Sequence, residues 1–384
     1  MPTDAVTTVA IAGITGSLGK LIAEYLLAKP NVRIHGLCRT PTKLPQSLRD
    51  EPRLTVYATS STDIAALRDA LRGSDVAICC YLGPNSLMVD GQKLLIDACI
   101  AEGVPRYIAG DWSMDFRKLE LGQHPPKDPM KLVQAYLEDK EAAGLLKAVH
   151  VLNACFLERP WVGIWDPKRN LFKYWGTGDE RWEFTTYRNA AQFTAEVAVD
   201  NNAVGWFSFR GDHVNIKEIA AEFQTVYGDE PGLERLGSLE DLFKLMHQKR
   251  DQNPDNAPAW LGLFYTYYSI NGQTTLPLPL DNERYPAVKL VTVRDFFAKT
   301  PKERLGKFGV FQSIIHAIQS PPGSGAIVES DPLAVGQVRH GFDQTVESES
   351  NFNHLLMILP NREICCVWGE GMWEFSKDCE REAP

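Results

Sequence analysis

The chain has 384 residues, enough for two or three domains, and its 44% apolar content is sufficient for a substantial hydrophobic core. Its net charge is −9 and it contains no long block of like charges, which argues against general nucleic-acid binding. No apolar run approaches the roughly eighteen residues of a membrane span, and no basic region precedes an apolar stretch at the N-terminus. The eight cysteines form no CxxC motif. We therefore expect a reduced, cytoplasmic protein with no membrane span, no signal peptide, no bound metal and no nucleic-acid partner.

The N-terminal segment has the pattern of a dinucleotide-binding unit. The apolar run Val9–Ala12 predicts a buried strand, and the amphipathic pattern up to Leu27 predicts a helix. Between them lies a GxxGxxG turn, whose glycines permit a tight turn, close approach of a pyrophosphate and helix–strand packing. Such turns also occur without a ligand, but the flanking strand and helix favour phosphate binding at the helix N-terminus. The phosphate-contacting residues we expect are Gly13, Thr15, Gly16, Ser17, Leu18 and Gly19.

The end of the second predicted strand, Val32–Cys38, bears on the choice of cofactor. NAD-binding units usually carry a carboxylate here for the ribose hydroxyls, and this chain has none. Arg39 lies about twenty residues beyond the last glycine, where a guanidinium can bind a 2′-phosphate, and Lys43 follows. The alternative is that both are solvated loop cations. We expect NADP(H).

Strands and helices continue to alternate as far as residue 156. The expected segments are strand Leu54–Ala58, helix Thr62–Leu71, strand Val76–Leu82, helix Gln92–Ala101, a strand at 104–110, helix Pro129–Ala143 and strand Ala148–Phe156. This alternation predicts an α/β protein with a Rossmann-type, doubly wound parallel sheet over residues 1–156. Because cofactors lie at the carboxyl ends of such strands, we expect Tyr81, Leu82 and Gly83 to face the cofactor.

The second half of the chain predicts a smaller α+β substrate domain over 157–300, with some segments returning to the sheet. Aromatic residues are dense in 157–188, where they alternate with glycine, proline and charged residues. They fit either loops over a cleft for a bulky aromatic ligand or the packing of a small domain. We expect helices at Asn189–Val199, Ile216–Tyr227, Leu239–Lys249 and Val293–Thr300. Residues 301–384 form an extension of uncertain order, with possible strands at Leu355–Leu359 and Glu363–Trp368.

Four stretches resemble the NmrA-like branch of the short-chain dehydrogenase/reductase superfamily, which includes isoflavone-reductase-like enzymes. They are the glycine turn, Arg39, Gln92–Gly110 with its AEGVPRYIAG sequence, and Leu152–Phe156. The segment Leu276–Pro286 resembles the small domain of fungal members. The resemblance covers about residues 5–300. It implies one of three functions: reduction of aromatic or alkaloid-like molecules with NADPH, isomerisation around a cofactor that is not consumed, or sensing of NAD(P) by a regulator that binds a protein partner.

The resemblance also implies a lysine near the start of the helix before the sixth strand. Lys131 is the nearest match, with Lys127 as the fallback, since the expected position is 130 or 131. Such a lysine holds the nicotinamide ribose or acts as acid/base; the alternative is a solvated first-turn cation. Tyr136 and Lys140 have the YxxxK spacing of ordinary short-chain dehydrogenases, but they lie too late in the helix for us to assign them catalysis.

Asp111 and Ser113 are the other catalytic candidates, because they follow the fifth strand at the mouth of the cofactor crevice. Asp111 either carries a proton or caps the next segment. Ser113 is suited to donate a hydrogen bond to the same substrate group, and Asn153 to orient backbone beside the cofactor. We interpret His35 and His150 as structural. The leading hypothesis is an NADPH-dependent oxidoreductase of secondary metabolism, a monomer or homodimer, that acts on a bulky aromatic or alkaloid-like molecule.

Overall fold

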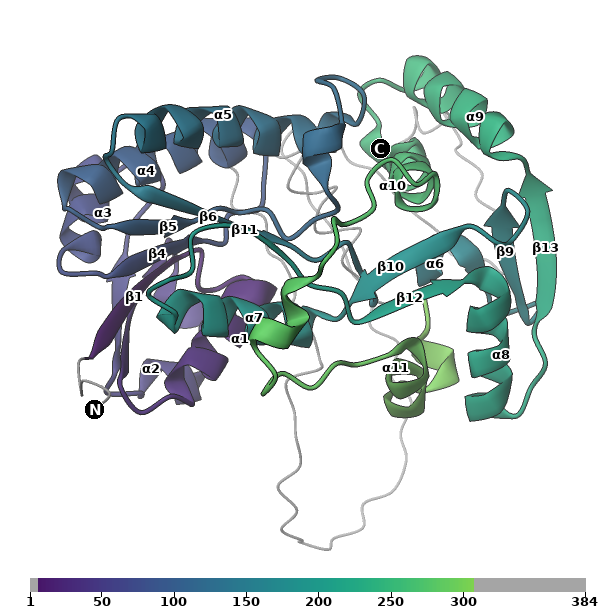
Figure 1. Ribbon diagram of the computed structural model, residues 1–384, viewed down its shortest axis with the longest axis horizontal. Coiled ribbons are helices and arrows are strands. Elements are labelled where there is room, and N and C mark those ends of the chain that lie inside the picture. The colour runs from purple at the N-terminus through teal and green to yellow at the C-terminus, as the bar shows by residue number, and fades with distance from the viewer. Residues whose placement is uncertain (1–5, 307–384) are drawn as a thin grey trace, which may run out of the picture. The chain divides into compact units, whose positions relative to one another are not determined.

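A seven-stranded parallel sheet forms the framework of the computed structural model, which describes residues 6–306 (Figure 1). All neighbouring strands in this sheet are parallel. In order across the sheet, the strands are β11 (Gly205–Ser208), β6 (Lys147–Leu152), β5 (Arg106–Ile108), β4 (Val76–Cys79), β1 (Thr7–Ala12), β2 (Val32–Cys38) and β3 (Leu54–Ala58). The strand order reverses between β1 and β4, which is where ligands bind in open sheets of this kind.

Helices cover both faces of this sheet, which explains why its central strands are apolar throughout. In β1, Val9 and Ile11 belong to one core, and Ala10 and Ala12 belong to the other. One face packs on α1 (Ser17–Leu27) and α7 (Tyr187–Val199), and the other on α3 (Ile64–Leu71), α4 (Gln92–Ala101) and α5 (Asp128–Ala142) (Figure 1). The short helix α2 (Gln46–Arg49) lies between β2 and β3. The doubly wound Rossmann-type fold is therefore confirmed.

Three expectations for the sheet need correction. The sixth strand ends at Leu152, and Ala154 takes a φ of 56°, so that Cys155–Phe156 forms a separate strand, β7, in another sheet. The fourth strand ends at Cys79 rather than Leu82. The seventh strand, β11, was not predicted, since four residues give too short an apolar pattern to recognise.

The second half of the described chain contains two small sheets, in a segment for which the sequence indicated mainly loops and helices. One has the order β12-β10-β7 and the other β13-β9-β8. Their remaining strands are β8 (Trp165–Asp166), β9 (Leu171–Trp175), β10 (Arg181–Thr185), β12 (Asp212–Asn215) and β13 (Gly232–Gly237). The accompanying helices are α6 (Trp161–Ile164), α8 (Ile216–Tyr227), α9 (Leu239–Gln252), α10 (Leu261–Ile270) and α11 (Val293–Lys299).

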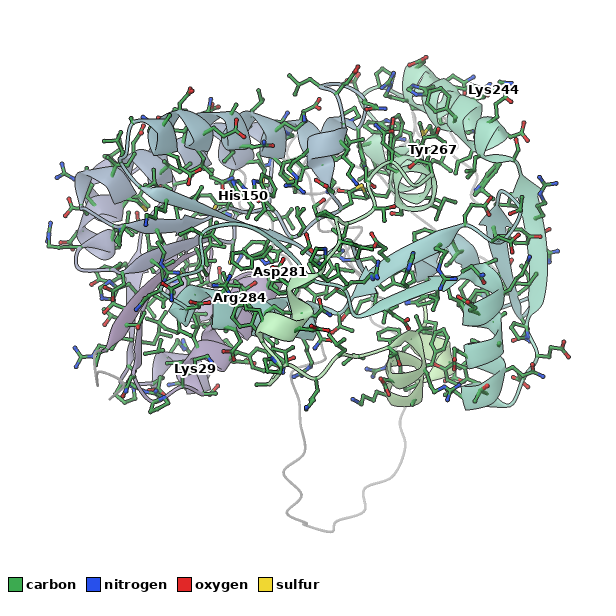
Figure 2. The ribbon with its side chains drawn as sticks, in the orientation of Figure 1. Lys29, His150, Lys244, Tyr267, Asp281 and Arg284 are labelled. Carbon is green, nitrogen blue, oxygen red and sulfur yellow. The ribbon has the colours of Figure 1, made fainter. Side chains whose placement is uncertain are left out.

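The segment after α10 returns to the large sheet and covers its edge. Asp281 accepts a 2.7 Å hydrogen bond from the Ser208 backbone N–H of edge strand β11, and Arg284 pairs with Asp200 at 2.6 Å (Figure 2). The edge of the sheet is thus protected from pairing with another chain.

None of the helices in residues 6–306 is long and apolar enough to cross a bilayer. The possible strands at Leu355–Leu359 and Glu363–Trp368, and most of the 301–384 extension, lie outside the described residues.

Candidate active site

Two glycines of the turn after β1 occupy positions where a side chain would clash. Gly13 has a φ of 84°, and a Cβ there would lie 2.7 Å from the Cys80 carbonyl oxygen beside β4. A Cβ on Gly19, in the first turn of α1, would lie 2.7 Å from the Gly13 carbonyl oxygen. Strand, turn and helix therefore pack closely enough for a phosphate group to reach the backbone.

The N-terminus of α1 is free to bind an anion. Gly16 precedes the helix, no side chain caps it, and its first turn carries no acidic residue. Ser17 and Leu18 line the adjoining cavity, where backbone N–H groups and the positive end of the helix dipole favour negative charge. These residues fit the pyrophosphate of a dinucleotide.

One cavity of about 2010 Å³ extends from this turn into the second half of the molecule. Beside the turn it is lined by Arg39 and Lys43, neither of which forms an ion pair with another described residue, and by the hydroxyl-rich segment 59–62 after β3. Among residues 6–306, no carboxylate lines this end. The predicted cofactor residues that line the cavity are Gly13, Thr15, Gly16, Ser17, Leu18, Gly19, Arg39, Lys43, Tyr81, Leu82 and Gly83.

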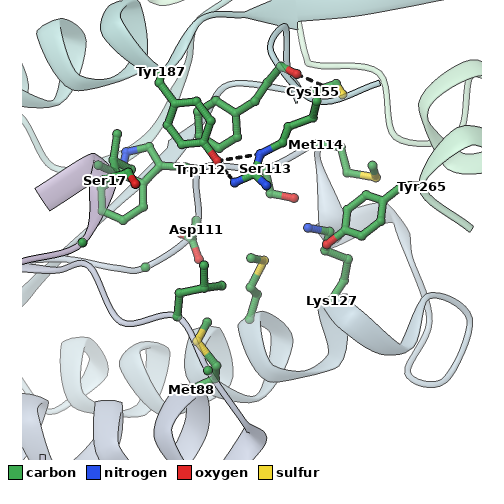
Figure 3. A pocket seen from close by; sticks show the side chains of 18 of the residues that line it. Ser17, Met88, Asp111, Trp112, Ser113, Met114, Lys127, Cys155, Tyr187 and Tyr265 are labelled. Carbon is green, nitrogen blue, oxygen red and sulfur yellow. Dashed lines mark hydrogen bonds between the residues drawn. The ribbon is translucent and has the colours of Figure 1, made fainter. Parts of the chain in front are cut away.

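Asp111 lies on the cavity wall in contact with a buried histidine. His150, inside β6, places its Nδ1 2.6 Å from Asp111 Oδ2, and the two residues are only 3% and 5% exposed. The imidazole stacks on Trp206 with ring centroids 4.0 Å apart, and the Arg117 guanidinium lies over the same indole. Asp111 lines the cavity (Figure 3), whereas His150 does not. His150, interpreted from sequence as structural, is thus the partner of the candidate acid.

Ser113 also reaches the cavity, whereas Asn153 does not. The Ser113 carbonyl accepts hydrogen bonds from the backbone N–H groups of Asn153 and Ala154, at 3.0 and 3.1 Å, which fixes the loop against the end of β6. The Ser113 hydroxyl is buried, lines the cavity and has no partner among the described residues. The Asn153 amide is also buried without such a partner, but it is not part of the cavity wall, so it is not placed to contact a cofactor there.

The structure brings Lys127, and not Lys131, to the cavity. The Lys131 ammonium lies 3.4 Å from the carbonyl oxygens of Phe116 and Arg117, away from the wall. Met130 does line the cavity. Successive helical residues point about 100° apart, so the one-residue uncertainty in the sequence comparison decides which side chain faces the ligand. Of the two candidate lysines, the fallback Lys127 lines the cavity and Lys131 does not.

Tyr136 and Lys140 are not arranged for catalysis. The Tyr136 hydroxyl donates to the Asp97 carboxylate of α4, with oxygen–oxygen distances of 2.7 and 2.8 Å, and the Lys140 ammonium lies 3.1 Å from the same carboxylate. Neither residue lines the cavity. This YxxxK pair joins two helices on the outside of the sheet.

The aromatic segment divides between the two roles left open by the sequence. Trp161, Phe172 and Phe184 are fully buried and form the core of the small domain. Other aromatic side chains line the far half of the cavity, namely Phe156, Tyr174, Trp175, Trp182, Tyr187 and Tyr265. For the first group the alternative of packing within a small domain holds, because their side chains meet one another from different strands and helices.

A polar pair is built into this aromatic wall. The Tyr187 ring stacks on Phe156 with centroids 3.8 Å apart, and the Arg159 Nε and Nη2 groups both donate to its hydroxyl oxygen, Nε at 2.8 Å. Burial raises the pKa of Tyr187, and the Arg159 charge opposes that rise. No short motif links residues 28 positions apart, so the sequence contains no signal for this pair.

Comparison with known proteins agrees with this geometry. A family model described as NAD(P)H-binding matches residues 13–161. The oxidoreductase ordB of Dothistroma septosporum is 30% identical over 167 residues, which are 40% of this chain and 61% of that protein. The chain matches less than two thirds of the length of this and other fungal oxidoreductases that it resembles.

Solved structures share the fold over most of the described chain. Isoflavone reductase superposes with a TM-score of 0.63 and 19% identity, covering 76% of this chain and 99% of that one. Leucoanthocyanidin reductase from Vitis vinifera, solved with NADPH, gives the same TM-score and identity, covering 76% and 98%. The chain therefore contains an NAD(P)H-binding region over residues 13–161 and shares its fold with isoflavone reductase and leucoanthocyanidin reductase.

Proposed function

We propose that this protein is an NADPH-dependent reductase of a bulky aromatic small molecule in secondary metabolism. The observation that carries the proposal is the continuous cavity, which joins an uncapped glycine turn to an aromatic wall and has the Asp111–His150 pair on its side. Similar folds occur in reductases named for isoflavone and leucoanthocyanidin, which are aromatic compounds. The fungal relatives are oxidoreductases.

The cofactor end of the cavity favours NADP(H) over NAD(H). Arg39 and Lys43 bring two unpaired cations to the end of β2, and no carboxylate is present there to bind ribose hydroxyls. A guanidinium makes bidentate hydrogen bonds to a phosphate, so Arg39 is the residue that recognises the 2′-phosphate.

We assign the proton transfer that a reduction requires to the Asp111–His150 pair. When bound, the reduced nicotinamide supplies a hydride to one carbon of the substrate. The reduction then requires one proton on the neighbouring oxygen, nitrogen or carbon. His150 Nδ1 lies within hydrogen-bond distance of Asp111 Oδ2, at 2.6 Å, and Asp111 is the member of the pair that lines the cavity. Asp111 is therefore the group that delivers the proton to the substrate. His150 positions Asp111 and resupplies it with a proton.

The test is turnover of aromatic ketones, enones and imines with NADPH. A reductase consumes one reduced nicotinamide for each product, whereas an isomerase forms product without loss of the reduced-nicotinamide absorbance, and a sensor binds the cofactor without forming product. We expect Asp111→Asn to lower kcat by about 10² or more with unchanged NADPH affinity. We expect Arg39→Ala to weaken NADPH binding about tenfold or more while sparing NADH. Unchanged turnover in Asp111→Asn would contradict the proton assignment.

A further inference from the structure

Lys127 is an almost completely buried cation without a counter-ion. The side chain is 4% exposed and lines the cavity. Its ammonium lies 4.8 Å from the centre of the Tyr265 ring, and among the described residues it forms neither a hydrogen bond nor an ion pair (Figure 3). A cation–π contact offsets only part of the hydration that a buried ammonium loses. The Lys127 ammonium is thus available to bind a negatively charged group of a ligand.

Arg159 adds a second unpaired charge in the same region. Its guanidinium donates only to the uncharged Tyr187 hydroxyl, and its Nη1 is buried with no partner among the described residues. Arg159, Lys127 and Cys155 all line the cavity. Because two Arg159 donors occupy the Tyr187 oxygen, the hydroxyl proton is free to be donated into the cavity.

The carboxylates of the cavity wall do not neutralise these cations. Asp111 and Glu180 are the only acidic residues that line the cavity within the described part of the chain. Asp111 is engaged by His150, and Glu180 accepts hydrogen bonds from the backbone N–H groups of Thr177 and Gly178. Lys127 and Arg159 therefore line the cavity without an ion pair to either of these carboxylates.

We propose that the cavity binds an aromatic anion, with its carboxylate or ionised phenol paired to Lys127 and hydrogen-bonded by the Tyr187 hydroxyl, and with Arg159 supplying charge behind that hydroxyl. The aromatic body of the ligand packs against Phe156, Tyr187 and Tyr265. This inference rests on the proposed function for the identity of the ligand as the substrate, but it predicts binding independently of turnover.

The test compares two probes of nearly equal size, 2-naphthoate and 2-naphthamide, by calorimetry at neutral pH on the full-length protein saturated with NADP+. We expect naphthoate to bind about tenfold more tightly or better, the range of a charge-assisted hydrogen bond. Lys127→Met should bring the two affinities within about twofold, and Lys127→Arg should retain much of the preference. Lys131→Met is the matched control, since its ammonium contacts backbone carbonyls outside the cavity, and it should leave the preference intact.

Three results would overturn the inference: equal or tighter binding of the amide, no binding of either probe to the NADP+-loaded protein, or a Lys127→Met variant that loses NADP+ affinity while retaining the naphthoate preference. The last result would mean that Lys127 pairs with the cofactor. Circular dichroism and NADP+ titration show whether each variant is folded. Failure of the proposed function has a different signature, because a sensor would show the naphthoate preference with no NADPH oxidation.

Discussion

Replacing Gly13 by alanine should damage both the fold and cofactor binding, for reasons that can be separated. The φ of 84° costs an L-residue about 1–2 kcal/mol. The new Cβ would also lie 2.7 Å from the Cys80 carbonyl oxygen, so backbone must move, and overpacking of this kind costs about 1–3 kcal/mol more. We therefore expect Gly13→Ala to lower the free energy of unfolding by about 2–5 kcal/mol. Because the displaced turn carries the phosphate-binding N–H groups, NADPH affinity should fall by about tenfold or more.

Gly73 provides the matched control. It has a φ of 74°, but a Cβ there would meet nothing within 4 Å, and it does not line the cavity. Gly73→Ala should therefore show the conformational cost alone, about 1–2 kcal/mol, with unchanged NADPH affinity. Urea unfolding and fluorescence titration of NADPH measure the two quantities. If Gly13→Ala were no less stable than Gly73→Ala, or bound NADPH equally well, the argument from close packing at the turn would be wrong.

Three further predictions concern other parts of the molecule. Arg106 is buried and donates to backbone carbonyls at the end of α7, so Arg106→Met should cost about 3 kcal/mol in urea unfolding, and a loss below 1 kcal/mol would contradict this role. The Thr292 backbone N–H, followed by its hydroxyl, lowers the pKa of Asp295 at the start of α11. Its stabilising contribution is therefore present above the ordinary carboxyl pKa near 4 and is lost as pH falls through the lowered value, so Asp295→Asn should narrow the difference in unfolding free energy between neutral pH and about pH 3. Tyr136→Phe should leave NADPH affinity and turnover unchanged, since Tyr136 pairs with Asp97 outside the cavity; a large drop in kcat would restore the YxxxK hypothesis.

The sequence by itself determined the cofactor half of the site. Val9–Ala12, the glycine turn and the first turn of α1 are contiguous, so their relative positions depend on local backbone geometry that glycine spacing encodes. Arg39 was equally predictable, because the carboxyl end of β2 must lie beside that of β1 in a parallel sheet. For these residues, the spacing along the chain is enough to predict how they are arranged in space.

Tertiary structure alone decided the catalytic half, because its groups come from segments that are far apart in the chain. Asp111 and His150 are 39 residues apart, and only the pairing of β5 with β6 brings them together. Lys127 ends the turn Pro125–Lys127 just before α5 and Lys131 lies in the first turns of that helix, yet only Lys127 lines the cavity, whereas the Lys131 ammonium contacts backbone carbonyls.

The aromatic segment shows the same limit. Trp161 and Trp182 are alike in sequence context, and whether each ring fills the core or faces a ligand depends on which strands and helices pack around it. Local patterns determined the glycine turn and the position of Arg39 beside it, whereas the proposed proton donor and the aromatic walls of the cavity depend on contacts between distant segments, which no local pattern encodes.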